Sequence, residues 1–183
     1  LPIPRRVHRY RNRIPRPPMT QHDTTIQWRD PAEGLAALPE LSGIEFMNRI
    51  ASGDLPGAPI ASHFAMDVVE VGPGTVTFRC RPDESHYNPI GTVHGGLVCT
   101  LLDSALGCAT HTTLPAGTGY TSIEIKVNYL RPVTVDSGPL ICTGRVTKPG
   151  SRVAFAEGEV LDSRGRVVAT ASGSLLIFAL PGR

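Results

Sequence analysis

One acidic residue stands inside an otherwise apolar stretch of the chain. Asp103 is the only Asp, Glu, Lys or Arg in residues 93–111, a run that is apolar almost all round. Burying a carboxylate costs several kcal/mol unless the group is paired or neutralised, and this stretch holds no Lys or Arg to pair with it. Asp103 therefore either hydrogen-bonds a neighbouring strand as a structural group or is held for general-base or nucleophilic chemistry. The residue pattern alone leaves both interpretations open.

Two glycines stand near the beginning of the same stretch, at Gly95 and Gly96. The first turn of a helix has N–H groups without partners in the helix, and its dipole favours negative charge there. Glycine lets a ligand oxygen approach those N–H groups closely. The pair could therefore polarise a carbonyl with main-chain donors. The simpler interpretation is that the glycines only allow close packing of a helix on a sheet.

Histidines supply weaker candidates. His94 precedes the glycine pair, but a histidine with no acid near it in sequence is more often structural. His86 and His111 are expected to be loop residues. None of the histidines or cysteines has the spacing of a zinc site, so we expect no metal.

Helix geometry constrains how Asp103 and Gly95 could cooperate. Eight residues along an α-helix correspond to a rise of about 12 Å. A general base and an oxyanion donor must each lie about 3 Å from one reacting group, so one straight helix cannot supply both. Two copies can, if their helices run antiparallel and side by side. We therefore expect a two-fold homodimer with two shared sites.

The elements that position these residues follow from hydrophobic periodicity and turn residues. Residues 41–52 have the spacing of a short amphipathic helix, and 93–111 that of a long buried one. Strands are expected at 62–71, 75–80, 121–130, 140–147, 152–161 and 166–178. Short turn-rich connections imply antiparallel pairing. The sequence therefore predicts an α+β domain in which one antiparallel sheet wraps around one long helix.

The strand over residues 121–130 alternates strictly between apolar and polar residues. This alternation places Ile123, Ile125, Val127 and Tyr129 on one face of the sheet.

Composition excludes several classes of protein. The chain has 183 residues, of which 40% are hydrophobic and 19% charged, with a net charge of +2. This is a globular composition, and no apolar run approaches the length of about 18 residues of a membrane span. Residues 1–18 carry six arginines and no acid, so the rest of the chain is net acidic. That segment is either sequence upstream of a start at Met19 or an Arg-rich targeting or nucleic-acid tail, and we expect no nucleic-acid partner.

The four cysteines form no CxxC pair and sit among apolar neighbours. Free cysteine in such surroundings behaves as a small buried hydrophobe. A reducing compartment fits best, and we expect a cytoplasmic protein.

Three stretches resemble a known family. They are HYNPIGTVHGGLVCTLLDSALG, TSIEIKVNYLRP and EGEVLDSRGRVVATASGSLLIF. They are similar to the hotdog-fold acyl-CoA thioesterases of the phenylacetate-pathway (PaaI) type, and the most specific match is the spacing Asn-x-x-Gly-x-x-His-Gly-Gly-x6-Asp. The resemblance implies a hotdog domain over residues 40–180, with residues 1–39 as a basic and polar extension expected to be flexible.

The resemblance also implies roles for matching positions. Asp103 would activate water or attack the thioester carbonyl, and the N–H of Gly95 would polarise that carbonyl. Asn88 would orient the thioester or the water, and Ser122 would help to hold the nucleophilic water. The reaction would be hydrolysis of an acyl-CoA, with an aryl or medium-chain acyl group, to the free acid and CoA. CoA is part of the substrate, no other cofactor is implied, and dimers could pair into a homotetramer.

Further residues are candidates for substrate binding. His94 and Gly96 flank Gly95, and Tyr129 could stack on the nucleotide or fill the core. Cations should line the entrance for the CoA phosphates, although each could equally be ordinary surface charge. These candidates are Arg131, Lys148 and Arg152. The acyl pocket would draw on apolar residues around 55–66 and on the buried helix.

Two other functions stay open. A non-catalytic acyl-CoA-binding hotdog module would bind without turnover, but it has no use for a costly buried carboxylate. A hotdog hydratase acting on enoyl or hydroxyacyl thioesters would need a His/Asp pair, and none is evident in the sequence.

Overall fold

The computed structural model describes residues 20–180. The Arg-rich segment 1–18 lies outside these residues, so the interpretations offered for it are not addressed. The helices are α1 (Ala32–Ala37), α2 (Gly43–Ser52), α3 (Pro59–His63) and α4 (Gly95–His111), with short 3₁₀ turns η1 (Glu84–His86) and η2 (Val135–Ser137). The strands are β1 (Met66–Gly72), β2 (Thr75–Cys80), β3 (Thr118–Tyr129), β4 (Leu140–Lys148), β5 (Val153–Leu161) and β6 (Val167–Ala179).

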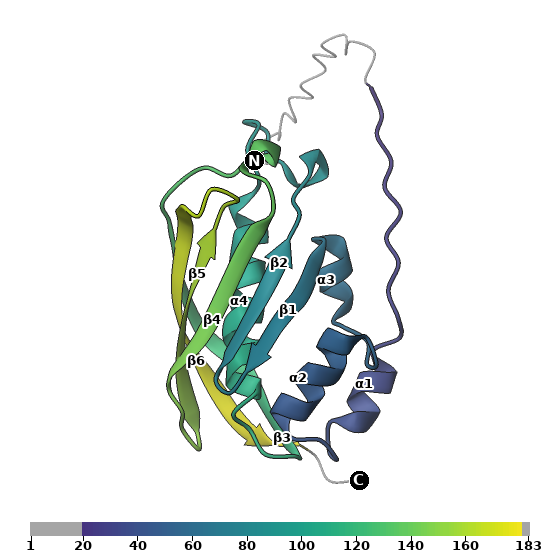
Figure 1. Cartoon of the computed structure of the whole chain (residues 1–183), viewed down its shortest axis with the longest axis vertical. Coiled ribbons are helices and arrows are strands. Elements are labelled where there is room, and N and C mark those ends of the chain that lie inside the picture. The colour runs from purple at the N-terminus through teal and green to yellow at the C-terminus, as the bar shows by residue number, and fades with distance from the viewer. Residues whose placement is uncertain (1–19, 181–183) are drawn as a thin grey trace, which may run out of the picture.

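All six strands form one antiparallel sheet in the order β1-β2-β4-β5-β6-β3. The sheet curves around α4, and α1, α2 and α3 gather beside its β1 edge (Figure 1). This is the hotdog fold, and it confirms the predicted sheet wrapped around one long helix. The two outer strands are β1 and β3, so β3 has a free edge along the described chain.

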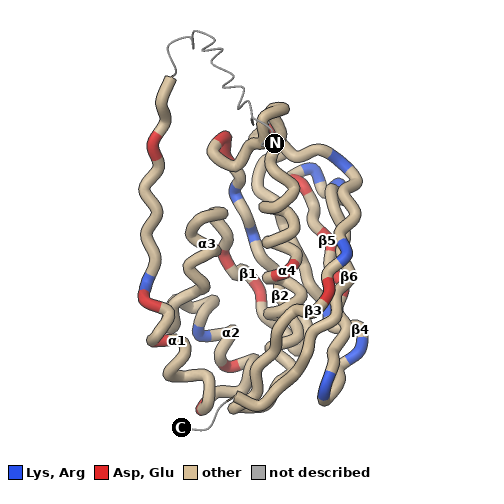
Figure 2. The backbone as a smooth tube through the Cα atoms, turned by 180° about the vertical axis from the view of Figure 1, so that it is seen from behind, with Lys and Arg blue, Asp and Glu red and all other residues tan. Residues whose placement is uncertain are grey.

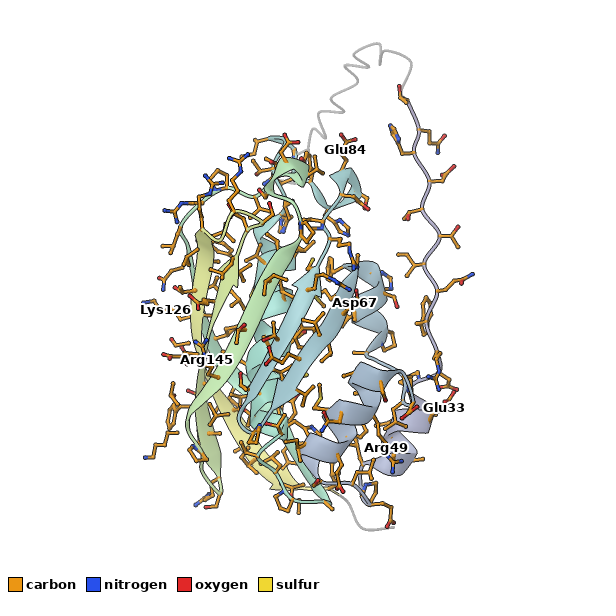
Figure 3. All side chains as sticks on the ribbon, viewed as in Figure 1. Glu33, Arg49, Asp67, Glu84, Lys126 and Arg145 are labelled. Atoms are coloured by element: carbon orange, nitrogen blue, oxygen red, sulfur yellow. The ribbon has the colours of Figure 1, made fainter. Side chains whose placement is uncertain are left out.

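The core lies between α4 and the concave face of the sheet. Leu97, Leu101, Leu102 and Leu106 of α4 are at most 2% exposed. The tube of α4 is almost free of Lys, Arg, Asp and Glu, whereas charges gather elsewhere on the surface (Figure 2). Lys126 on β3 points away from α4 into solvent (Figure 3). Burial of apolar side chains therefore holds the helix in the sheet.

Close packing of α4 on the sheet requires a glycine at one crossing point. A Cβ atom on Gly144 of β4 would lie 2.3 Å from the main-chain oxygen of Ala105 in α4. Real Cβ atoms do not come that close to another heavy atom, so only glycine lets the helix lie this deep in the sheet. This approach fixes the height of α4, and with it Asp103, above the strands.

Local signals explain several element boundaries. Ser42 and Glu45 form a reciprocal capping box at the start of α2. In the β1–β2 hairpin, Pro73 and Gly74 form the turn, and Gly74 has a φ of +70°, as the second central residue of a type II turn requires.

The structure corrects three predictions. The strand predicted at 62–71 starts only at Met66, because Pro59 opens the short helix α3 instead. The polar stretch before residue 40, in which no helix was predicted, contains α1. His111, predicted in a loop, is the last residue of α4, because the helix continues through Thr110 before it ends.

Candidate functional site

Asp103 lies on the one face of α4 that the sheet leaves uncovered. The half-buried residues of this face are Gly95, Gly96, Cys99, Thr100, Asp103, Ser104 and Cys108. Asp103 is therefore half-buried rather than enclosed. Its Oδ1 accepts a hydrogen bond of 2.7 Å from the Ser122 hydroxyl of β3. Oδ2 accepts no hydrogen bond from residues 20–180, so one oxygen is held and the other is free for a ligand or water.

A β-bulge turns Ser122 toward Asp103. The register of β3 against β6 shifts between Ser122 and Glu124, so Ile123 is an extra residue in the strand. Because of this extra residue, Ile123, which is 55% exposed, does not share one face of the sheet with Ile125, as the alternation of residues 121–130 predicted. In a regular strand Ser122 and Ile125 would point to opposite faces, whereas the bulge places both on the face of α4. The bulge is thus the local feature that builds the Ser122–Asp103 contact.

Asp103 and Ser122 open into a cavity of about 770 Å³, here called the Asp103 cavity. Its polar wall comes mainly from α4 and β3: Asp103, Ser104, Cys108, His111, Tyr120 and Ser122. Three further polar residues also line it: Arg29, Ser52 and Asp67. Its apolar wall includes residues of α1, α2 and α3 and of the segment between α2 and α3: Leu35, Leu38, Phe46, Met47, Ile50, Leu55, Pro56 and Ile60. The cavity therefore places a carboxylate beside space shaped for an apolar group.

Gly95 lies in a separate cleft of about 300 Å³ near the start of α4, here called the Gly95 cleft. The Gly95 N–H donates to no acceptor among residues 20–180, whereas its carbonyl accepts from the Tyr129 hydroxyl at 3.0 Å. A Cβ atom on Gly95 would lie 3.2 Å from the Tyr129 ring, so a side chain there would press on that ring. Within one chain, Gly95 and Asp103 thus open into different hollows.

The residues around Gly95 are engaged in local structure. His94 is the N-cap of α4, and its Nδ1 accepts a hydrogen bond of 2.9 Å from the Gly96 N–H. Asn88 holds the preceding loop: its amide nitrogen donates to the Thr92 hydroxyl at 2.9 Å and its amide oxygen accepts from the Ile90 N–H at 3.0 Å. The Gly95 N–H is therefore left as the free donor of this helix start.

The predicted cations divide between two ends of the molecule. Arg131 lines the Gly95 cleft, and its guanidinium donates to the Val167 carbonyl. Lys148 ends β4 and Arg152 precedes β5, and neither lines the Asp103 cavity or the Gly95 cleft. Arg131 therefore lies beside Gly95, where a cation for the CoA phosphates was expected, whereas Lys148 and Arg152 lie away from both hollows.

Besides Ser104, three polar residues that α4 and β3 place in the Asp103 cavity were missed by the sequence analysis: Cys108, His111 and Tyr120. Burial raises the pKa of the Cys108 thiol to about 12 and raises the pKa of Tyr120 well above its ordinary range. Burial lowers the pKa of His111. All three side chains are therefore neutral near pH 7. The position of Cys108 and His111 on the same helix as Asp103 could have indicated them, but only once that helix was known to have one open face.

Residues 20–180 hold neither a metal-binding cluster nor a membrane-spanning helix. No group of three His, Cys, Asp or Glu side chains is arranged to hold a metal ion. No helix in this part of the chain is long and apolar enough to cross a membrane.

Comparison with known proteins decides the family. Residues 90–169 match the model of the thioesterase superfamily. Human acyl-coenzyme A thioesterase 13 is 30% identical over 103 residues, which cover 56% of this chain and 72% of that protein. The chain belongs to the thioesterase superfamily. This chain is a thioester hydrolase.

Several solved structures share the fold of this chain. The PaaI protein of E. coli, from the phenylacetic acid degradation operon, superimposes with a TM-score of 0.65 at 20% identity, covering 78% of this chain and 98% of that one. Thioesterase HI1161 of Haemophilus influenzae has the same TM-score at 18% identity, covering 80% and 97%. A protein of Streptococcus mutans bound to acetyl CoA has a TM-score of 0.58 at 23% identity, covering 64% and 91%.

Proposed function

We propose that this thioesterase hydrolyses acyl-CoA thioesters to the free acid and CoA, with Asp103 as the catalytic carboxylate. The observation that carries the proposal is the position of Asp103. One carboxylate oxygen accepts a hydrogen bond from Ser122 and the other is free. Asp103 and Ser122 both line a largely apolar cavity. A thioester whose acyl group fills this cavity would present its carbonyl carbon to the carboxylate.

Water must add to the carbonyl carbon, and the C–S bond must break. Asp103 takes the proton of the attacking water, or attacks first and forms an anhydride that water then opens. The sulfur leaves as the CoA thiolate and takes up a proton. The free N–H of Gly95 stabilises the oxyanion that forms on the carbonyl, and Asn88, whose amide is bonded to Thr92 and Ile90, holds the loop that precedes Gly95.

A two-fold dimer completes this site. Gly95 and Asp103 lie on one open face of α4, about 12 Å apart along the helix. Two antiparallel α4 helices packed through that face would bring Gly95 of one protomer to Asp103 of the other. The free edge of β3 supports this arrangement, since two β3 strands can pair across the same axis and Ile123, Tyr129 and Leu130 are each more than half exposed.

The acyl class follows from the Asp103 cavity. Its apolar wall and volume of about 770 Å³ fit an aryl group or a medium-length chain. The CoA part lies outside, where Arg131 of the partner supplies a cation and Tyr129 a ring for stacking. A Streptococcus mutans protein of the same fold bound to acetyl CoA supports the choice of CoA as the carrier.

The decisive experiment is a free-thiol release assay over aromatic and aliphatic acyl-CoAs, with wild type and Asp103→Asn side by side. We expect hydrolysis that falls by several orders of magnitude in the variant. The matched control is Asp54→Asn, an exposed acid at the end of α2. Tight acyl-CoA binding without turnover would instead indicate a binding module, and hydration of an enoyl-CoA without thiol release would indicate a hydratase.

Mixed dimers test the shared site. Asp103→Asn subunits and Gly95→Pro subunits are each expected to be inactive, because the second change removes the donor N–H. Mixing them should restore part of the activity, since one of the two sites in a mixed dimer is intact. A mixture that forms hybrid dimers and stays inactive contradicts the shared site.

The cysteines bear on location. Cys80, Cys99, Cys108 and Cys142 are all free thiols. Free cysteines persist in reducing compartments, so we place the protein in the cytoplasm.

A further inference from the structure

The last residue of α4 reaches the Asp103 cavity and has no part in the proposed hydrolysis. His111 lines the cavity and is only 8% exposed. Its ring stacks on Phe46 of α2 at 5.3 Å and meets the edge of Tyr120 on β3 at 5.5 Å. The imidazole is therefore held in one position by two aromatic neighbours.

Neither ring nitrogen of His111 is hydrogen-bonded to any of residues 20–180. Among the described residues, Arg79 Nε is the one unpaired side-chain atom that is sealed from solvent, so the unpaired nitrogens of His111 are accessible. Because His111 lines the cavity, a molecule inside the cavity is placed to supply the missing partner. The site thus has an unused hydrogen-bonding group facing the space that we assign to the acyl chain.

The distance from the reacting carbonyl sets where that partner must lie. His111 follows Asp103 by eight residues on α4, which is about 12 Å of helix rise. An acyl group with its carbonyl at Asp103 would run along this helix, past Cys108, toward His111. The partner of His111 therefore belongs at the far end of a medium-length chain.

The charges of the residues that line the cavity indicate which chemical group would bind His111. Burial lowers the pKa of His111 and raises that of Tyr120, so both are neutral near pH 7. Arg29 is the only Lys or Arg among the described residues that line the cavity, and it is already bound to Glu33 and to the Gly53 carbonyl. A carboxylate would find no free cation here. A hydroxyl suits a neutral imidazole because it can both donate and accept.

We infer that the Asp103 cavity takes acyl groups that carry a hydroxyl at the far end, and that His111 is the residue that selects them. The inference rests on the proposed function, because it assumes that the acyl group occupies this cavity. It adds a preference between acyl chains of equal length, which the apolar wall alone cannot provide.

The test measures binding, so that it does not depend on turnover. Dissociation constants are determined by calorimetry on Asp103→Asn for medium-chain ω-hydroxyacyl-CoAs, each against the unsubstituted acyl-CoA of equal length. At the best chain length we expect the hydroxylated thioester to bind about tenfold more tightly, as for one added hydrogen bond. Adding His111→Phe, which keeps an aromatic ring against Phe46, should bring this ratio to about one.

Two further variants sharpen the result. His111→Gln keeps a hydrogen-bonding group and should retain part of the preference, whereas His22→Phe makes the same aromatic change at an exposed position and should retain all of it. Equal affinities at every chain length overturn the inference, as does a preference that survives His111→Phe or a terminal carboxylate that binds better than the hydroxyl. Hydrolysis of the unsubstituted thioesters by wild type is scored separately and tests only the proposed function.

Discussion

Ser122 Oγ on β3 and Asp103 Oδ1 on α4 are joined by a hydrogen bond of 2.7 Å. This bond fixes the rotamer of the carboxylate and occupies one of its oxygens. The free oxygen then faces the Asp103 cavity in a defined direction. In the proposed mechanism Ser122 is therefore a positioning residue, which would act on the reaction by holding Asp103.

Ser122→Ala should lower kcat by about 10- to 100-fold, the usual loss for a hydrogen bond to a charged group. KM should change little, since the acyl and CoA contacts stay in place. Thiol release measured over a range of substrate concentrations separates the two constants. The control Ser172→Ala makes the same substitution at an exposed position of β6 and should leave kcat and KM unchanged. A Ser122→Ala enzyme with normal kcat would mean that Asp103 does not depend on this bond.

The fold could largely be predicted from the sequence. The apolar run around Asp103 indicated the central helix, and turn-rich tetrapeptides separated the later strands correctly. Short local elements were harder, because α1 and α3 each have six or fewer residues and little periodicity to detect.

The site could be predicted only in part. The motif pointed to Asp103 and Gly95, and the structure shows both on the open face of α4. The sequence could not show that a bulge at Ile123 turns Ser122 inward. Apolar and polar residues alternate strictly through this strand, so nothing in their order indicates that one residue is extra. Nor could it show His111 at the cavity, because that position depends on where α4 ends and on how α2 packs against it.

Gly144→Ala should destabilise the protein by about 1–3 kcal/mol or more, as overpacking of a core does. The new Cβ would lie 2.3 Å from the Ala105 carbonyl oxygen, so α4 must lift from the sheet. Urea unfolding gives the change in free energy. Gly57→Ala is the matched control, because its Cβ would come no nearer than 4.0 Å to a neighbouring side chain, and it should unfold like wild type.

Acid should destabilise the folded protein through His111. Burial lowers its pKa in the folded state, whereas the unfolded chain binds the proton near pH 6.5. Between the two pKa values the unfolded state binds more protons, so the free energy of unfolding falls as the pH drops below about 6.5. The groups that face the ring, Phe46 and Tyr120, carry no charge at these pH values.

The measurement is urea unfolding at several pH values between 5 and 8. His111→Phe should show a smaller loss of stability on acidification than wild type, and His22→Phe should show the wild-type loss. An equal decline in wild type and His111→Phe would exclude His111 as the titrating group.

The proposed dimer places one cysteine on its axis. If Gly95 of one protomer faces Asp103 of the other across antiparallel α4 helices, the midpoint of the contact is residue 99. Cys99 lies on the open face of α4 and is half-buried, whereas Cys80 and Cys142 are buried in the core. The axes of packed helices lie about 8–10 Å apart, and each Cα atom lies about 2.3 Å from its axis, so two facing Cα atoms come to about 3.4–5.4 Å. Disulfides form when two Cα atoms come within about 7 Å. The two Cys99 thiols should therefore meet.

Copper phenanthroline catalyses the oxidation of two such thiols to a disulfide by dioxygen, which takes up the two electrons and two protons and becomes hydrogen peroxide. Non-reducing electrophoresis should then show a covalent dimer that dithiothreitol returns to monomer. Cys99→Ser keeps the other three cysteines and should give no covalent dimer. If wild type runs as a dimer in solution but Cys99 does not cross-link, the two-fold axis lies elsewhere on α4, and the pairing of Gly95 with Asp103 across the interface would have to be abandoned.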